Sequence, residues 1–175
     1  MAARDANEPA SANRTSMGLE GDREIVIART FNAPARLVFD AWTQPEHVRR
    51  WWAPKSHGVS IVDCAADVRV GGDYRYVARL DTGGEFAFSG KYVEVTPYSR
   101  LVYTEIFEPT ASGAKPGDAE LIITVTFDEQ QGKTHLVSRS LCPSTEVRDT
   151  ILASGMEHGM REAMEQLEEL LGSLR

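Results

Sequence analysis

Short turns separate a series of β-branched and aromatic segments that begins at residue 58, and this series limits the possible fold more than any other feature. In the segment 73–80, tyrosine and other apolar residues recur at alternate positions, which is typical of a strand with one buried face. The following Asp81-Thr82-Gly83-Gly84 favours a hairpin turn. Consecutive strands joined by such short connections are antiparallel neighbours. The predicted strands cover residues 58–64, 73–80, 85–95, 100–107, 120–128 and 134–141.

A long amphipathic segment follows the last strand and offers the cover that a one-sided sheet needs. Ser144 is a good N-cap residue, so we predict one continuous helix from there to about residue 172. Gly155 and Gly159 fall inside it, where each costs about 1 kcal/mol relative to alanine. We therefore expect the helix to approach the sheet closely at these glycines. Apolar or small residues recur at spacings of three and four, namely Leu152, Met156, Gly159, Met160, Ala163, Leu167 and Leu170.

The remaining segments indicate one domain preceded by a tail. Residues 1–21 contain no valine, isoleucine or aromatic residue, so we predict a disordered tail there and a single domain over 22–175. A strand over 24–31 precedes two short helices, which we place at about 34–43 and 43–53. The predicted fold class is α+β, with a curved antiparallel sheet of about six to seven strands. The two short helices follow its first strand, and the long C-terminal helix packs across it.

Charge and cysteine content narrow the range of partners. The 26 acidic and 19 basic side chains give a net charge of −7, which argues against nucleic acid or an anionic membrane as the main partner. No apolar stretch reaches the ~18 residues of a membrane helix, so we expect no membrane insertion. Cys64 and Cys142 each end an apolar run, and we interpret them as buried thiols of a cytoplasmic protein. The oligomeric state stays open.

Three stretches, at residues 31–52, 90–104 and 155–171, occur in an order that resembles a known family. They begin with Phe-Asn-Ala-Pro, Gly-Lys-Tyr-Val and Gly-Met-Glu-His, and the first ends in two adjacent tryptophans. The chain is similar over about residues 23–172 to the activator of heat-shock-protein-90 ATPase homologue family. That family belongs to the START-like, SRPBCC superfamily with the helix-grip fold, which birch-pollen-type allergens share.

The resemblance implies a function as well as a fold. It implies that a small apolar molecule, such as a lipid, a polyketide or an aromatic compound, binds in a cavity under the long helix. Two alternatives remain open: a protein-interaction module that regulates a chaperone ATPase, and an enzyme of cyclase or dehydratase type that uses the same cavity. Fold alone does not decide between them.

The three tryptophans of the chain, Trp42, Trp51 and Trp52, lie within eleven residues of one another. They form either the mouth of a ligand cavity or the core anchors of the two short helices, since indole rings bury a large area. Two adjacent tryptophans cannot both point inward, so we expect either Trp51 or Trp52 to be partly exposed.

Aromatic residues on successive strands indicate the wall of the cavity. With two methionines of the C-terminal helix they would form an adaptable apolar surface. The alternative is a filled core without a void. The candidate wall residues are Tyr74, Tyr76, Phe86, Phe88, Tyr103, Phe107, Met156 and Met160.

Two charged residues lie within otherwise apolar strands. If Glu105 and Arg139 both point inward, they would pair and could anchor a polar group of the ligand, because an unpaired buried charge is costly. The alternative is that both face solvent. An enzyme would require two or more polar groups to converge in the cavity, such as Glu105, Arg139 and Tyr103.

Other chemistry lacks a signature in the sequence. The histidines show no HxH or HxxxH spacing, there is no CxxC pair, and no nucleophile elbow occurs. We therefore predict no metal site, no cofactor and no catalytic residue. These absences favour a binding role over an enzymatic one.

Overall fold

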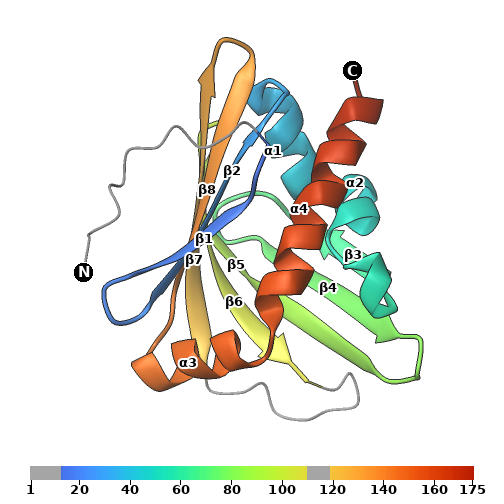
Figure 1. Cartoon of the computed structure of the whole chain (residues 1–175), viewed down its shortest axis with the longest axis vertical. Coiled ribbons are helices and arrows are strands. Elements are labelled where there is room, and N and C mark those ends of the chain that lie inside the picture. Colours follow the sequence, from blue (N-terminus) through green and yellow to red (C-terminus); the bar gives the residue numbers. More distant parts are fainter. Residues whose placement is uncertain (1–12, 110–118) are drawn as a thin grey trace.

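The computed structural model describes residues 13–109 and 119–175, and they form one curved antiparallel sheet with helices on its concave side (Figure 1). The sheet has eight strands in the order β1-β2-β8-β7-β6-β5-β4-β3. The strands are β1 (Ser16–Glu20), β2 (Glu24–Phe31), β3 (Val59–Ala66), β4 (Asp73–Leu80), β5 (Glu85–Thr96), β6 (Arg100–Glu108), β7 (Glu120–Gln130) and β8 (Lys133–Leu141). The helical segments are α1 (Ala35–Thr43), α2 (Pro45–Trp51), the 3-10 turn η1 (Lys55–His57), α3 (Thr145–Ala153) and α4 (Met156–Ser173).

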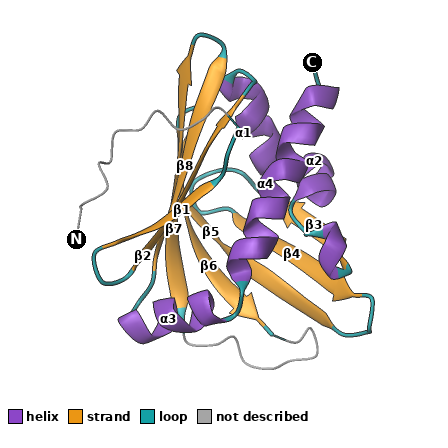
Figure 2. Ribbon diagram, in the orientation of Figure 1, coloured by secondary structure: helices purple, strands orange, loops and turns teal. Residues whose placement is uncertain are grey.

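The helices cover only one face of the sheet, as Figure 2 shows. The period-two pattern of β2 points Ile25, Ile27 and Phe31 into the core, where each is at most 2% exposed. From α4, Leu167 and Leu171 meet this layer and are completely buried. The predicted α+β, helix-grip fold class is confirmed, and the strand that was not predicted is β1.

The region 16–20 corrects the prediction of a disordered tail over residues 1–21. In the structure it is strand β1, which pairs with β2 through registers such as Met17 with Ile27. Leu19 is 51% exposed, so main-chain pairing rather than apolar burial holds this strand. A composition low in apolar residues argues only against burial. It does not exclude an edge strand that is held by main-chain hydrogen bonds. The tail prediction for residues 1–12 lies outside the described residues.

The single C-terminal helix of the prediction is in fact two helices. Gly155 adopts φ +78° between α3 and α4, a left-handed conformation that ends one helix and begins the next. Gly159 does lie at a close approach, but to the loop before β3 rather than to the sheet. A Cβ there would be 3.3 Å from Pro54 and 3.6 Å from the ring of His57.

Gly90 lies inside strand β5 at a close approach to β6, and an interior glycine in a strand often marks such an approach or a bulge. A Cβ at this position would lie 1.8 Å from the carbonyl oxygen of Thr104 on β6. The register between β5 and β6 shifts just beyond it, between Tyr92 and Glu94. Only glycine lets the two backbones come this close, and the aromatic pocket described below lies beside this part of the sheet.

The structure also bears on the two cysteines and on the question of a membrane-spanning helix. Cys64 and Cys142 are both buried and free, as expected, and burial raises the pKa of the Cys64 thiol to about 11. Among the described residues, no helix has the length and apolar character required to cross a membrane.

Candidate functional site

A small internal pocket lies where the bent part of the sheet meets α1 and α2. Its enclosed space is about 30 Å³, which is room for one or two water molecules. Sites for drug-sized ligands are roughly 300 Å³ and larger. The empty ligand cavity of the prediction is therefore absent from this conformation, and aromatic side chains fill most of the space. The lining residues are Trp42, Trp51, Trp52, Tyr74, Tyr76, Tyr92, Tyr103 and Glu105.

Strand pairing brings the tyrosines to the pocket. Tyr74 and Tyr76 alternate with outward-facing residues on β4, so both point to the concave side. On the neighbouring strands, Tyr92 of β5 is the direct cross-strand partner of Tyr103 of β6. Tyr74 lies at the centre of the group, with ring centroids 5.1 Å from Tyr76, 5.8 Å from Tyr92 and 5.4 Å from Tyr103.

The tryptophans close the pocket on the helical side. Trp51 is 2% exposed, and its indole Nε1 donates a hydrogen bond of 2.8 Å to the carbonyl oxygen of Ala41. The Trp42 ring lies 4.9 Å from that of Trp51, between centroids. Trp52 is partly exposed, which confirms that only one of the two adjacent tryptophans is fully buried. Its ring contacts Tyr76 at a centroid distance of 5.8 Å.

Glu105 is the single acidic residue of the pocket lining. Desolvation raises the pKa of its carboxyl from the ordinary 4.5 to about 7, although a hydrogen bond from Tyr74 opposes the shift. The Tyr74 hydroxyl donates at 3.0 Å to the carbonyl oxygen of Thr104 and lies 3.4 Å from Glu105 Oε2. Because the one hydroxyl proton goes mainly to Thr104, the Glu105 carboxyl keeps hydrogen-bonding capacity that faces the pocket.

The tyrosines share this low-polarity environment. Burial, followed by the nearby Glu105, raises the pKa of Tyr74 and Tyr103 far above its ordinary value. Burial also raises the pKa of Tyr76 well above 10 and that of Tyr92 to about 12. No lysine, arginine or histidine of the described residues lines the pocket. The pocket therefore disfavours negative charge and contains no positive charge to offset it.

The structure brings seven of the predicted site residues together in this pocket. They are Trp42, Trp51, Trp52, Tyr74, Tyr76, Tyr103 and Glu105.

Tyr92 is the pocket residue that the sequence analysis missed. It lies on the same face of β5 as Phe86 and Phe88, at even spacing from both, and is 4% exposed. The alternation that selects those two phenylalanines therefore also selects Tyr92, despite the bend at the intervening glycine.

The predicted phenylalanines form a second cluster that continues from the pocket. Phe88 lies 5.1 Å from Phe107 and 6.1 Å from Phe86, between ring centroids. Trp52 connects the two groups, because its ring is 5.0 Å from that of Phe88 as well as in contact with Tyr76. Phe107 is 46% exposed, so this cluster reaches the surface.

Three further predicted residues belong neither to the pocket lining nor to the phenylalanine cluster. Arg139 lies on the outer face of β8 and forms ion pairs with Glu20 and Glu24, so the expected inward pair with Glu105 does not form. The side chains of β8 alternate between the two faces of the sheet as expected. The pairing register of β8 with its neighbours decides which face Arg139 occupies. Met160 packs against the main core and Met156 is half-buried, and neither belongs to the lining.

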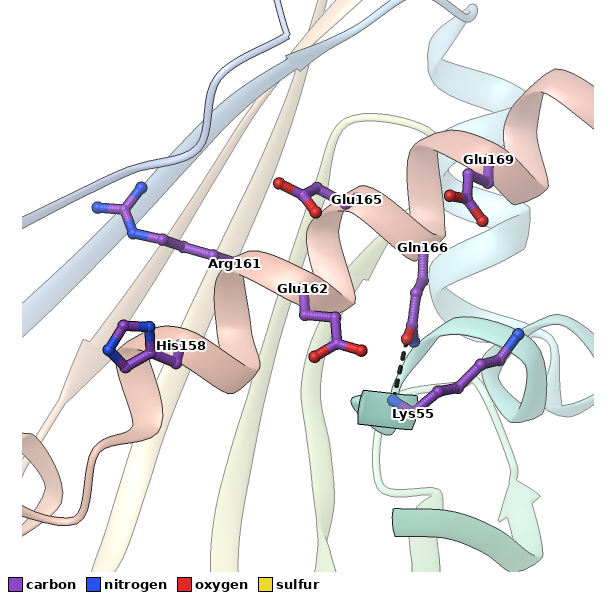
Figure 3. Close-up of a pocket in the computed structure, with 7 residues that line it drawn as sticks. All are labelled: Lys55, His158, Arg161, Glu162, Glu165, Gln166 and Glu169. Atoms are coloured by element: carbon purple, nitrogen blue, oxygen red, sulfur yellow. Dashed lines mark hydrogen bonds between the residues drawn. The ribbon is translucent and has the colours of Figure 1, made fainter. Parts of the chain in front are cut away.

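A larger surface groove lies along α4 beside η1, and nothing in the sequence analysis predicted it (Figure 3). It encloses about 500 Å³ and is lined by Lys55, His158, Arg161, Glu162, Glu165, Gln166 and Glu169. Several of these side chains already have structural partners. Gln166 accepts a hydrogen bond from the Lys55 backbone N–H, and Glu162 accepts one from the backbone N–H of Ser56. The groove has no apolar wall, so the aromatic pocket is the better candidate for a functional site.

Comparisons with known proteins agree with the fold. A crystal structure of a protein from Nitrosomonas europaea is 25% identical, with a TM-score of 0.76 over 89% of this chain and 97% of that one. A protein from Rhodobacter sphaeroides is 23% identical, with a TM-score of 0.81 over 92% of this chain and 99% of the other. An NMR structure from Arthrobacter aurescens is 24% identical, with a TM-score of 0.80 over 90% and 91%. No curated protein matches the chain.

The family model described as "Activator of Hsp90 ATPase homolog 1-like protein" matches residues 32–172, a range that contains the whole pocket. Family and fold together support a ligand-binding or regulatory module in general terms. The match covers most of the chain, and the protein therefore belongs to the activator of Hsp90 ATPase homolog 1-like family.

Proposed function

We propose that this protein binds a small molecule with an apolar body in the aromatic pocket, and that Glu105 anchors the polar end of that molecule. The observation that carries the proposal is a half-buried carboxyl in a pocket that seven aromatic residues line, in contact with one tyrosine hydroxyl. Partial removal of a carboxyl from water is costly unless a ligand or water binds to it. A purely structural core would fill this position more stably with an apolar residue.

Ligand entry requires the pocket to widen, because about 30 Å³ holds no more than a terminal group. Trp52 is the side chain best placed to move. Its neighbour Trp51 is fixed by a hydrogen bond to Ala41, whereas the Trp52 indole donates none to the described residues. Trp52 is also partly exposed and stands between the pocket and the phenylalanine cluster. Rotation of this one ring would join the two spaces.

The phenylalanine cluster would then accommodate the apolar body of the ligand. Phe86, Phe88 and Phe107 present adjacent rings beyond Trp52, and Phe107 reaches solvent. In this arrangement the ligand enters along the phenylalanines and places its polar group beside Glu105. Apolar walls with one or two polar anchors are typical of small-molecule sites.

Tryptophan fluorescence offers a direct test, because all three tryptophans of the chain line the pocket. A library of small neutral and charged aromatic and aliphatic compounds is titrated while emission is recorded, and freshly purified protein is examined by native mass spectrometry for a bound passenger. The proposal predicts saturable emission changes or a stoichiometric passenger. The variant Val93→Ala, at a 55% exposed position outside the pocket, is the control and should bind as the unaltered protein does.

Two other functions are alternatives to this proposal. A cyclase or dehydratase role needs two or more polar groups that converge in the pocket; Tyr103 and Glu105 do line it, whereas Arg139 lies on the outer face of the sheet. Regulation of a chaperone ATPase is raised by the family description alone. If no compound in the library binds and no passenger is found, small-molecule binding is refuted, and an ATPase stimulation assay becomes the next measurement.

A further inference from the structure

Seven of the eight residues that line the pocket are aromatic. Centroids of Tyr74, Tyr92 and Tyr103 lie 5.4 to 5.9 Å from one another at interplanar angles of 50° to 83°, which is the geometry of aromatic rings in mutual contact. Trp42 and Trp51 add two further rings on the helical side. A positive group within about 6 Å of a ring face is attracted by the ring quadrupole, most strongly for tryptophan.

The polar content of the pocket favours the same kind of guest. The titratable groups that face Glu105 are tyrosines from three strands: Tyr74 and Tyr76 from β4, Tyr92 from β5 and Tyr103 from β6. The helices α1 and α2 contribute only tryptophans, and no basic side chain of the described residues lines the site. A cation entering the pocket would thus meet one carboxyl and the rings or hydroxyls of aromatic residues, with no positive charge to repel it.

The size of the enclosed space points to a small cationic end group. About 30 Å³ accepts a group as large as a water molecule, which suits the ammonium end of an amine. Methyl substituents on the nitrogen would need the wider pocket that rotation of Trp52 creates. A bare metal ion is a poor fit, because the site offers a single carboxyl and hard cations require about six oxygen ligands.

We infer that the ligand of this pocket is an organic ammonium ion, whose positive nitrogen lies in the aromatic pocket beside Glu105 while its apolar part extends along the phenylalanine cluster. This inference rests on the proposed function and specifies the ligand class for the same site. Cation–π attraction and ion pairing to a desolvated carboxylate reinforce each other here, because both strengthen when water is excluded.

A matched pair of probes separates charge from shape. Choline carries a quaternary ammonium group, and 3,3-dimethylbutan-1-ol has the same shape with a carbon atom in place of the nitrogen. Isothermal titration calorimetry of the full chain at pH 8 should show choline binding about tenfold or more tightly than the alcohol, since desolvated cation–π contacts and one ion pair together exceed a tenfold effect.

The pH dependence identifies Glu105 as the anchoring group. Choline binding requires the ionised carboxylate, whereas burial holds the pKa of Glu105 at about 7 in the free protein. The ionised fraction rises about tenfold between pH 6 and pH 8, so the apparent affinity for choline should rise about tenfold over that interval. The neutral alcohol should show no such rise.

Two variants complete the test. Glu105→Gln keeps the shape of the side chain and removes its charge, so it should weaken choline binding about tenfold at pH 8 and abolish the pH dependence. Glu108→Gln is the matched control, because Glu108 belongs to the same strand but pairs with Arg75 on the outer face. Its binding of choline should equal that of the unaltered chain.

The outcomes are distinct for the two proposals. If the alcohol binds as tightly as choline, or if choline binding weakens as the pH rises, the ammonium inference is wrong and small-molecule binding stands. If neither probe binds while a neutral compound of the library changes tryptophan emission, the inference is likewise overturned. Choline binding that is tighter than the alcohol, stronger at high pH and dependent on Glu105 supports it.

Discussion

The variant Glu105→Gln should change how the stability of the protein depends on pH. The folded state raises the pKa of Glu105 from 4.5 to about 7, so the folded protein holds this proton where the unfolded chain has released it. The contribution of Glu105 to the free energy of unfolding is therefore greatest at low pH. It falls as the pH rises from about 4.5 through about 7, because a buried carboxylate must then form.

The magnitude follows from the size of the shift. Each pKa unit corresponds to about 1.4 kcal/mol, so the interval from pH 5 to pH 8 costs the folded protein roughly 2 to 3 kcal/mol at this one residue. The glutamine side chain does not ionise, so the free energy of unfolding of the variant does not fall for this reason. We therefore expect the stability of Glu105→Gln, relative to the unaltered protein, to increase by about 2 to 3 kcal/mol between pH 5 and pH 8.

Urea unfolding followed by circular dichroism at both pH values measures this difference. Other titrating groups affect both proteins equally and cancel in the comparison. The control Glu108→Gln removes an outer-face carboxylate from the same strand, and its relative stability should change by less than about 1 kcal/mol over the interval. A relative stability of Glu105→Gln that stays constant within about 0.5 kcal/mol would refute the assignment of Glu105 as a buried acid.

Three further predictions concern the scaffold of the site. Gly90→Ala would place a Cβ 1.8 Å from the backbone oxygen of Thr104, so we expect a loss of about 3 kcal/mol or more, visible as a low yield of folded protein. Gly155→Ala meets no atom within 4 Å but has φ +78°, and it should cost about 1 to 2 kcal/mol in urea unfolding. Gln166→Leu removes hydrogen bonds to the backbone of Trp51, Ala53 and Lys55 and should lower the free energy of unfolding by about 3 kcal/mol.

Period-two alternation predicted the aromatic residues of the pocket wall better than it predicted the placement of the charged residues. Tyr74 and Tyr76 could be assigned to the concave face because the residues between them are polar. The same reasoning applies to β6, where an inward Tyr103 places Glu105 on the same face. For Arg139 the sequence left both faces open, since the register against β2 decides the outcome and a shift of one residue exchanges the faces.

The break between α3 and α4 illustrates a different limit. The apolar stripe continues at the same spacing from Leu152 through Met156 to Met160, which predicts one helix. Gly155, which is not part of the stripe, overrides this pattern by adopting a left-handed conformation that a residue with a side chain rarely adopts. Periodicity records which residues are apolar, but it does not record a change in helix direction at a single glycine.

The volume of the pocket could not be derived from the sequence at all. The aromatic residues that favour a ligand cavity are equally suited to filling it, and the choice depends on side-chain rotamers. In the structure, pairs such as Trp42 with Trp51 and Tyr74 with Tyr103 contact each other and leave about 30 Å³. Opening of that space would depend on rotation of Trp52 and on the side chains around it.

The most direct test of the account is an NMR titration that follows the indole N–H signals of the three tryptophans. Choline and its neutral isostere are added in turn up to about 10 mM, tenfold above a millimolar dissociation constant. Binding in the pocket predicts saturable shifts of the Trp42 and Trp52 signals with choline, larger than those with the isostere. Indole signals that do not move with either compound, or that move only in linear proportion to concentration, would contradict the account.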